Sequence, residues 1–250
     1  MEEARPDPAG AHVLVVTAVS AERDAVAAAF GGPRQEIPRA GVTLHRVTAP
    51  GTTVDLLAGG VGPAAAAAAA AVALTAAALT GAAYDLVVST GIGGGFPPDA
   101  PVGSLVVADE IVAGDLGAET ADGFLSLPAL GFGRVTHRPP EGLVRRCAAA
   151  TGARVGPVLT VSTVTGSARR AAALRARHPG VLAEAMEGFG VAEAASVAGC
   201  PVLEIRAVSN PVGPRERDLW RVEDALTALT GAFVKLTRHC AERTLRPASP

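Results

Sequence analysis

The sequence has few aromatic residues, few cysteines and almost no net charge. Aromatic residues make up 3% of the 250 positions, which argues against the stacking platforms that bind single-stranded nucleic acids. A formal net charge of −2 gives no basic surface for a nucleic-acid partner. Cys147, Cys200 and Cys240 lie far apart and are odd in number. This pattern is typical of reduced thiols, so we expect a cytoplasmic protein.

Metal-binding and membrane motifs are also missing. No CxxC or HExxH spacing occurs, which argues against a structural or hydrolytic zinc ion. The alanine run 64–73 is too weakly apolar for a membrane span and predicts a buried helix instead. Residues 1–10 lack a basic region followed by an apolar stretch, so no signal peptide is expected there. We expect the ends, 1–11 and 244–250, to fray.

Short β-branched segments alternate with helical segments along the whole chain. Strands are predicted at 13–17, 42–47, 54–57, 85–89, 104–112, 155–161 and 201–208. Helices are predicted after a cap at Ser20, from Pro63, and at 143–150, 168–177 (capped by Ser167), 187–198 and 218–243. The segment 114–140 shows no period and is expected to be a long loop. This alternation predicts a single α/β domain over 1–250 with a largely parallel sheet covered on both faces.

Two glycine clusters need separate interpretation. Gly60-Val-Gly-Pro-Ala-Ala65 fits a loose dinucleotide-binding pattern, but the next strand ends without the acid that would bind ribose hydroxyls. The cluster Gly91–Gly95 fails the pattern because Phe96 stands where glycine is needed. No Walker lysine follows either cluster. Both clusters therefore predict tight turns and close packing rather than a nicotinamide or P-loop site.

A carboxylate and an amide stand out near the end of the chain. Ala-Met-Glu-Gly-Phe-Gly-Val-Ala, from Ala185, sets Glu187 at the start of an apolar helix, and the next strand ends in Asn210. Carboxylates are rarely buried without partners, and vicinal ribose hydroxyls would suit Glu187. The carboxyl edge of an open sheet is where α/β folds bind ligands. We expect both groups at that edge.

These residues resemble the purine nucleoside phosphorylase and nucleosidase family, in which a Met-Glu pair binds ribose and an Asp or Asn binds the purine. The resemblance implies a three-layer α/β/α sandwich with a central, twisted, mixed and mostly parallel sheet. It also implies a nucleoside substrate, a homo-oligomer that is a dimer or larger, and neither cofactor nor metal. The implied catalytic residues are Glu22 and Asn210, and the implied substrate-binding residues are Gly91, Ile92, Gly93, Val164, Thr165, Met186, Glu187, Arg217 and Trp220.

The resemblance gives Glu22 and Asn210 specific roles. Family nucleosidases carry a water-activating Glu just after the first strand, where Glu22 stands, although spacing alone favours a helix-terminal acid. The amide NH₂ of Asn210 can bridge O6 and N7 of a 6-oxopurine, whereas an ionised Asp would repel O6. The prediction is therefore hydrolytic cleavage of a hypoxanthine nucleoside.

Three other functions stay open. A phosphorylase would need a phosphate site, and Arg23 alone is a weak signal for one. A methylthioadenosine or adenosylhomocysteine nucleosidase would need an acid that reads adenine. A nucleoside-binding module without catalysis would not need Glu22 beside Glu187. If the substrate carries a carboxylate, Arg215 or Arg217 is a suitable partner for it.

Overall fold

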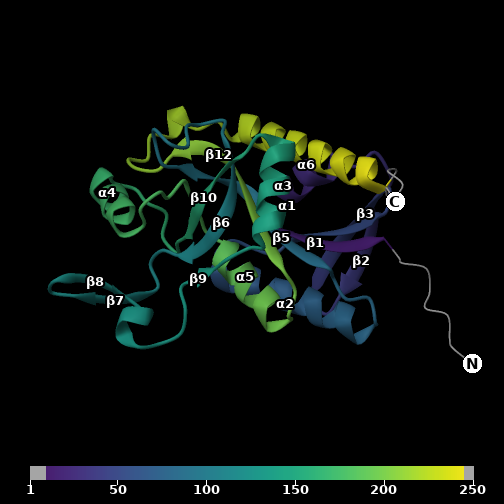
Figure 1. The fold of residues 1–250 in the computed structure, drawn as a ribbon, viewed down its shortest axis with the longest axis horizontal. Helices are drawn as coiled ribbons and strands as arrows, with labels where there is room; N and C mark the ends of the chain where they lie inside the picture. The colour runs from purple at the N-terminus through teal and green to yellow at the C-terminus, as the bar shows by residue number, and fades with distance from the viewer. Residues whose placement is uncertain (1–9, 245–250) are drawn as a thin grey trace, which may run out of the picture.

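The computed structural model describes residues 10–244, and side chains through residue 238. Figure 1 shows the arrangement of its strands and helices. In chain order the elements are β1 (Ala11–Thr17), α1 (Ser20–Ala27), β2 (Gln35–Arg39), β3 (Val42–Ala49), β4 (Thr52–Ala58), α2 (Pro63–Leu79), β5 (Leu86–Gly95), β6 (Leu105–Ala113), β7 (Gly117–Thr120), β8 (Gly123–Ser126), η1 (Pro128–Leu130), β9 (Thr136–His137), α3 (Glu141–Thr151), β10 (Arg154–Thr160), α4 (Ala168–Arg177), β11 (Ala183–Ala185), α5 (Gly188–Val197), β12 (Val202–Pro211), η2 (Arg217–Leu219) and α6 (Val222–Thr244).

A ten-stranded mixed sheet forms the centre of the molecule. Its strand order is β11-β10-β6-β12-β5-β1-β4-β3-β2, with β9 beside β6. The pairs of β1 with β4 and β5, of β5 with β12, and of β10 with β6 and β11 are parallel. Helices cover both faces, as Figure 1 shows, so the structure is a three-layer α/β/α sandwich. The predicted fold class is confirmed.

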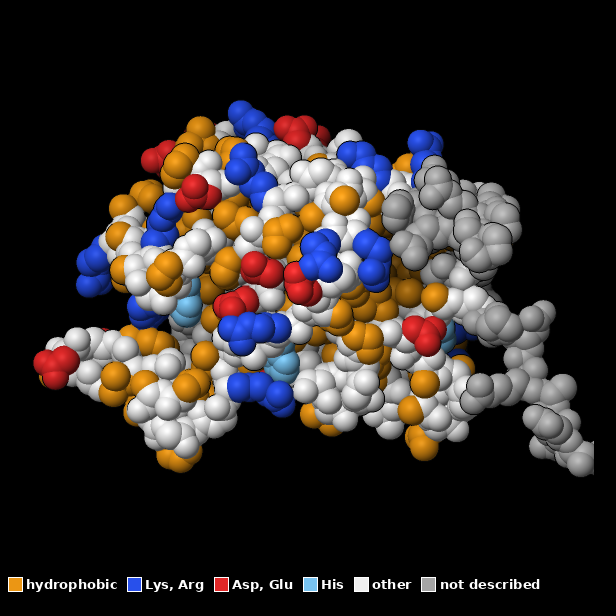
Figure 2. All heavy atoms as spheres, in the orientation of Figure 1, with side chains coloured by type: hydrophobic (Ala, Val, Ile, Leu, Met, Phe, Trp, Pro, Cys, Tyr) orange, Lys and Arg blue, Asp and Glu red, His pale blue; other side chains and the backbone are white. Residues whose placement is uncertain are grey.

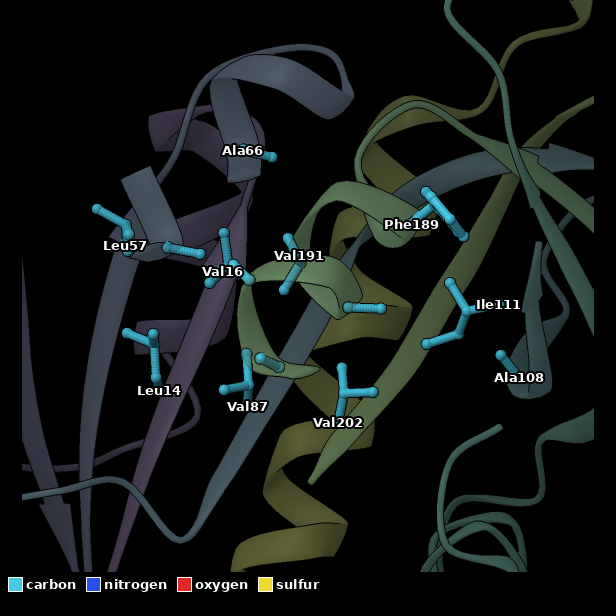
Figure 3. Packing of buried hydrophobic residues seen from close by; sticks show 14 of the residues in the cluster. Leu14, Val16, Leu57, Ala66, Val87, Ala108, Ile111, Phe189, Val191 and Val202 are labelled. Carbon is cyan, nitrogen blue, oxygen red and sulfur yellow. The ribbon is translucent and has the colours of Figure 1, made fainter. Parts of the chain in front are cut away.

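Alternation along the strands divides the core between the two faces. Leu14 and Val16 of β1 belong to one apolar cluster with α2 and α5, while Val15 belongs to the opposite cluster with α1, α3 and α6. Figure 3 shows side chains of the first cluster, including Val191 of α5 and Ala66 of α2. A strand whose successive side chains are all apolar is expected when both faces are buried.

One end of the sheet closes on itself. The short strand β11 pairs in parallel with β10 and antiparallel with β5, so β5, β12, β6, β10 and β11 form a ring. In this ring Gly94 is paired with Glu184 on one side and with Asn210 on the other. The register therefore brings two polar residues, 26 positions apart in the chain, to the two flanks of one glycine.

The glycine cluster of β5 differs from the prediction. The strand runs through to Gly95, beyond the predicted end at Ser89. A Cβ at Gly93 would lie 2.8 Å from the carbonyl oxygen of Glu184, and a Cβ at Gly95 would lie 2.0 Å from that of Ala100. These glycines therefore permit close approach of neighbouring backbones inside the sheet, rather than a turn.

Other elements also depart from the sequence predictions. Residues 114–140, expected to be a loop, contain the β7–β8 hairpin and β9. The unpredicted strand β2 contains Pro38, which an edge strand tolerates. Val19, not Ser20, caps α1, and α6 begins at Val222 after the short turn η2. The residues 1–9 and 245–250 lie outside the described part, while Ala11 begins β1 and Thr244 ends α6.

The described helices include none that is both long enough and apolar enough to cross a membrane. Figure 2 shows Lys and Arg side chains interspersed with Asp and Glu on the face that it displays. A mixed arrangement of this kind gives no extended basic track on that face for a phosphate backbone.

The carboxylate of Asp55, on β4, connects several segments on the side of the sheet opposite to the carboxyl ends of the strands. Its carboxylate accepts hydrogen bonds from Arg46 (2.7 and 2.8 Å), the Tyr84 hydroxyl (2.7 Å) and the His12 ring (3.1 Å). Burial by itself would raise the pKa of Asp55, but the hydrogen bonds from Arg46 and Tyr84 hold it below its ordinary value of 3.8.

We expect Asp55→Asn to lower the free energy of unfolding near neutral pH by about 1–3 kcal/mol, because the buried donors lose their charged acceptor. Because the pKa of Asp55 is lowered in the folded state, its ionised carboxylate stabilises the fold fully above the ordinary pKa of the group. This stabilisation is lost as pH falls through the folded-state pKa. The difference from the wild type is therefore expected to shrink only below about pH 4, as measured by urea unfolding. The control is Glu36→Gln, an exposed acid 3.6 Å from His45. Equal losses in both variants would contradict this role of Asp55.

Candidate active site

The guanidinium of Arg206 is the centre of a buried charged cluster. Arg206 lies on β12 and is 0% exposed. Its Nε donates to Glu204 (2.8 Å), its Nη1 to Glu187 (3.4 Å) and its Nη2 to the Ser89 hydroxyl (3.0 Å). Three elements, β5, α5 and β12, therefore supply side chains to one cation.

Glu22 joins this cluster from the first turn of α1. Its Oε2 accepts from the backbone N–H groups of Ala18 (2.9 Å) and Val19 (3.3 Å), and its Oε1 accepts from that of Ile92 (2.9 Å). A Cβ at Gly91 would lie 2.5 Å from Glu22 Oε1 and 3.0 Å from Arg206 Nη1. Gly91 therefore lets the Glu22 carboxylate and the cation lie beside the same point of β5.

Glu187 is held at the other side of the cation. It is the N-cap residue of α5, and its carboxylate accepts from the N–H groups of Gly62 (3.2 Å) and Met186 (3.3 Å). Gly62 directly precedes α2, so Glu187 connects the beginnings of two helices. Glu187 as a whole residue is 5% exposed, while Met186 is half-buried.

Glu204 is the most deeply buried acid of the cluster. Its Oε2 has no hydrogen-bond partner among the described residues, and a Cβ at Gly188 would lie 2.3 Å from its oxygens. Burial raises the pKa of Glu204, and the Arg206 charge only partly opposes this shift. Burial would lower the pKa of Arg206, but the fields of Glu204, Glu187 and Glu22 raise it. The acids therefore keep Arg206 charged.

A cavity of about 170 Å³ opens next to this cluster. Asn210 lines it at the end of β12; the amide Oδ1 accepts from the Ser209 hydroxyl (2.9 Å) and Nδ2 donates to the Pro211 carbonyl (3.1 Å). The second hydrogen of Nδ2 is left for another acceptor. The full lining is Ile92, Gly93, Gly94, Val164, Thr165, Glu184, Ala185, Ser209, Asn210, Pro211, Val212, Gly213, Pro214, Arg215 and Trp220.

Ile92 connects the cluster with the cavity, because its N–H donates to Glu22 and the residue also lines the cavity. Of the predicted site residues, one group belongs to the charged cluster or contacts it: Glu22, Gly91, Met186 and Glu187. A second group lines the cavity: Ile92, Gly93, Val164, Thr165, Asn210 and Trp220. Arg217 lies outside the cavity lining and is exposed, with its guanidinium 6.0 Å from the Trp220 ring.

The sequence predictions missed three polar residues of this region: Glu184, Glu204 and Arg206. Glu204 and Arg206 are two positions apart in the otherwise apolar stretch 202–208 of β12, so they share one face of the strand. Charged residues at this spacing inside a buried strand are a signal that could have identified them. Glu184 lies in β11, which has only three residues and is defined by its pairing with β5. The local sequence therefore shows no strand pattern around Glu184.

Comparison with known proteins identifies the class. A model of the phosphorylase superfamily matches residues 12–242, so the chain belongs to that superfamily. The futalosine hydrolase of Streptomyces coelicolor is 70% identical over 225 residues, which cover 90% of this chain and 94% of that protein. The futalosine hydrolase of Acidothermus cellulolyticus is 43% identical over 228 residues, 89% of each chain. The family predicted from the sequence is confirmed.

Solved structures share the fold at lower identity. The 5′-methylthioadenosine/S-adenosylhomocysteine nucleosidase from Neisseria meningitidis has a TM-score of 0.77 at 20% identity, covering 91% of this chain and 99% of its own. The S-adenosylhomocysteine nucleosidase from Streptococcus pyogenes has a TM-score of 0.78 at 19% identity, covering 92% and 97%. At this identity the likeness establishes the architecture.

We expect Arg206→Met to lower the free energy of unfolding by about 3–5 kcal/mol at pH 8, because the buried carboxylates lose their only bonded cation among the described residues. The loss is expected to be smaller at about pH 5.5, because burial raises the pKa of Glu204 and its protonation relieves the repulsion between the acids. Chemical unfolding at the two pH values measures both quantities.

The matched control is Arg169→Met, which removes an exposed cation from α4 and is expected to change stability by less than about 0.5 kcal/mol. A loss for Arg206→Met that does not depend on pH would point to packing rather than charge as the reason for its burial.

Proposed function

We propose that the protein is a futalosine hydrolase, which cleaves the N-glycosidic bond of futalosine to release hypoxanthine and dehypoxanthinyl futalosine. The 70% identity to the Streptomyces coelicolor enzyme over 90% of the chain carries this proposal. The buried acids beside a cavity that ends in an amide support it. The reaction belongs to an alternative route to menaquinone, which the resemblance to futalosine hydrolases implies.

The proposed mechanism begins with departure of the base. As the glycosidic bond breaks, the ribose gains positive charge and the purine gains negative charge. In the proposed mechanism Glu187 accepts hydrogen bonds from the ribose hydroxyls, and its charge stabilises the oxocarbenium-like sugar. Its fixed position, set by Gly62, Met186 and Arg206, supports this role, because a preorganised charge needs no reorganisation during the reaction.

Asn210 is proposed to receive the charge on the departing base. Its Nδ2 keeps one hydrogen free of the Pro211 bond and lies 3.4 Å from the position that a Cβ of Gly94 would take. That hydrogen would donate toward O6 or N7 of a 6-oxopurine. The amide supports a 6-oxopurine over adenine, whose exocyclic amino group is itself a donor.

Glu22 is proposed to activate water at the anomeric carbon. Three backbone N–H groups orient its carboxylate. A general base needs such a fixed orientation, because it must lie within hydrogen-bonding distance of the water that it deprotonates. The neighbouring Arg23 donates to Asp24 through Nε (3.1 Å) and Nη2 (3.0 Å), so its guanidinium is already paired. This pairing supports water over phosphate as the nucleophile.

We expect the wild type to release hypoxanthine from futalosine, with a free hydroxyl at the anomeric carbon of the sugar even when phosphate is present. Glu22→Gln is expected to lower kcat by about 10²-fold or more, since the amide cannot remove a proton from water. Chromatography of the products, with futalosine, inosine and methylthioadenosine as separate substrates, measures both the reaction and its selectivity.

Glu141→Gln, an exposed acid at the start of α3, is the control and is expected to keep full turnover. A sugar 1-phosphate product would assign a phosphorylase instead. Normal turnover of Glu22→Gln would return Glu22 to the role of a helix-terminal acid.

The homo-oligomer predicted from the resemblance is also proposed, with α2 and α5 as the surface between two copies. A groove between these helices is lined mainly by alanines with Leu74, Leu79 and Val197, and also by Thr75 and Glu193. Leu79 is 83% exposed and Val197 is 88% exposed. Exposed apolar side chains beside a groove are typical of a contact surface. We also propose a cytoplasmic location, in line with the free thiols of Cys147 and Cys200.

We expect light scattering to give the mass of a dimer or a larger assembly for the wild type. The double change Leu79→Glu and Val197→Glu is expected to dissociate it, because the charges would be desolvated in the contact. Val155→Glu changes a comparably apolar but distant exposed residue and is expected to leave the mass unchanged. A monomeric wild type would overturn this proposal.

A further inference from the structure

Glu184 is a buried carboxylate that the proposed mechanism leaves without a role. It is 5% exposed and lines the cavity together with Asn210. Its Oε1 accepts from the backbone N–H of Thr165 (2.7 Å), and its Oε2 accepts from the Thr165 hydroxyl (2.5 Å). Each carboxylate oxygen can accept more than one hydrogen bond, so both keep acceptor capacity toward the cavity.

The environment of Glu184 is unusual for a structural acid. Among the described residues it has no ion-pair partner, whereas the acids around Arg206 share a cation. Burial raises the pKa of Glu184, and the two Thr165 hydrogen bonds only partly oppose the shift. More distant charges also act on it: Arg170 of α4 lowers this pKa and Asp115 raises it. Arg215 faces the same cavity from the segment after β12.

The sheet register sets Glu184 across the cavity from the amide. Glu184 of β11 and Asn210 of β12 are both paired with Gly94 of β5, one on each side. Two strand spacings separate their backbones by about 10 Å. Since both residues line one cavity, a flat bicyclic ring held between them would meet a carboxylate at one edge and an amide at the other.

We propose that Glu184 is a specificity-determining residue that accepts a hydrogen bond from N1–H of a 6-oxopurine whose O6 and N7 face Asn210. This inference rests on the proposed function, since it assumes that the cavity holds the purine. It assigns a second contact to the base, on the edge that Asn210 does not reach.

The two purine classes differ at N1. Hypoxanthine has a hydrogen on N1 and donates it, whereas adenine has a lone pair there. An ionised Glu184 therefore attracts N1–H of hypoxanthine and repels N1 of adenine. A protonated Glu184 would instead donate to adenine N1. The preference for hypoxanthine is therefore expected to weaken as pH falls and the carboxyl becomes protonated.

The test measures binding of the free bases, independently of catalysis. Trp220 is the only tryptophan of the chain and lines the cavity, so its fluorescence reports on binding of hypoxanthine and of adenine. We expect the wild type to prefer hypoxanthine, and Glu184→Gln to reduce the affinity ratio by about 10- to 100-fold, because the amide can donate to adenine N1. Asp55→Asn is the matched control: it removes another buried acid, far from the cavity lining, and is expected to leave the ratio unchanged.

Two further measurements do not depend on whether Glu184→Gln folds. In the wild type, the preference for hypoxanthine is expected to fall as pH is lowered from about 8 through the raised pKa of Glu184. In Thr165→Val, which removes one hydrogen bond that lowers the pKa of Glu184, the same fall is expected at a higher pH. A ratio that stays flat with pH in both proteins, or an unchanged ratio in folded Glu184→Gln, would overturn the inference.

The two proposals fail separately in this design. If the wild type prefers hypoxanthine through Glu184 but does not hydrolyse futalosine, the proposed function is wrong and the base contact stands. If the wild type hydrolyses futalosine while Glu184→Gln keeps the wild-type ratio, the base contact is wrong and the function stands.

Discussion

The buried guanidinium of Arg206 is the interaction on which the rest of the site depends. It holds Glu187 and Glu204 directly, and its charge also acts on Glu22. Buried ion pairs often add little net stability, because desolvation offsets their attraction. Their value here is positional: three acids from different elements are held around one cation in a small volume. A carboxylate that must face a sugar cation needs this fixed geometry more than it needs extra stability.

The glycines of β5 are the second constraint. A side chain at Gly91 would displace Glu22, and one at Gly93 would collide with the backbone of β11. Without a Cβ at these positions, α1, β11 and β12 can all approach one strand. The cluster Gly91–Gly95 is therefore neither a phosphate loop nor a turn. It lets acidic and amide side chains lie against one strand end, at the carboxyl edge where α/β sheets bind ligands.

How much the sequence could predict depended on how local each signal was. Glu187 and Asn210 each end or begin an element with a clear apolar pattern, and the family motif around them identified both. Glu22 needed the resemblance, because spacing alone favours a helix-terminal acid, and the structure shows that it also reaches Ile92. Glu184 could not be predicted, because β11 has three residues and is defined only by pairing with β5 and β10. The course of β5 through its glycines was missed for the same reason, since partners distant in sequence determine it.

Neighbouring residues of β5 border the two parts of the site. Gly91 and Ile92 contact Glu22 and border the charged cluster, whereas Gly94 lies between Asn210 and Glu184 at the cavity. Under the proposed function, sugar chemistry and base recognition therefore use different residues on a shared backbone. On that proposal, substitutions at the cavity end are expected to change which base is accepted without moving the acids around Arg206.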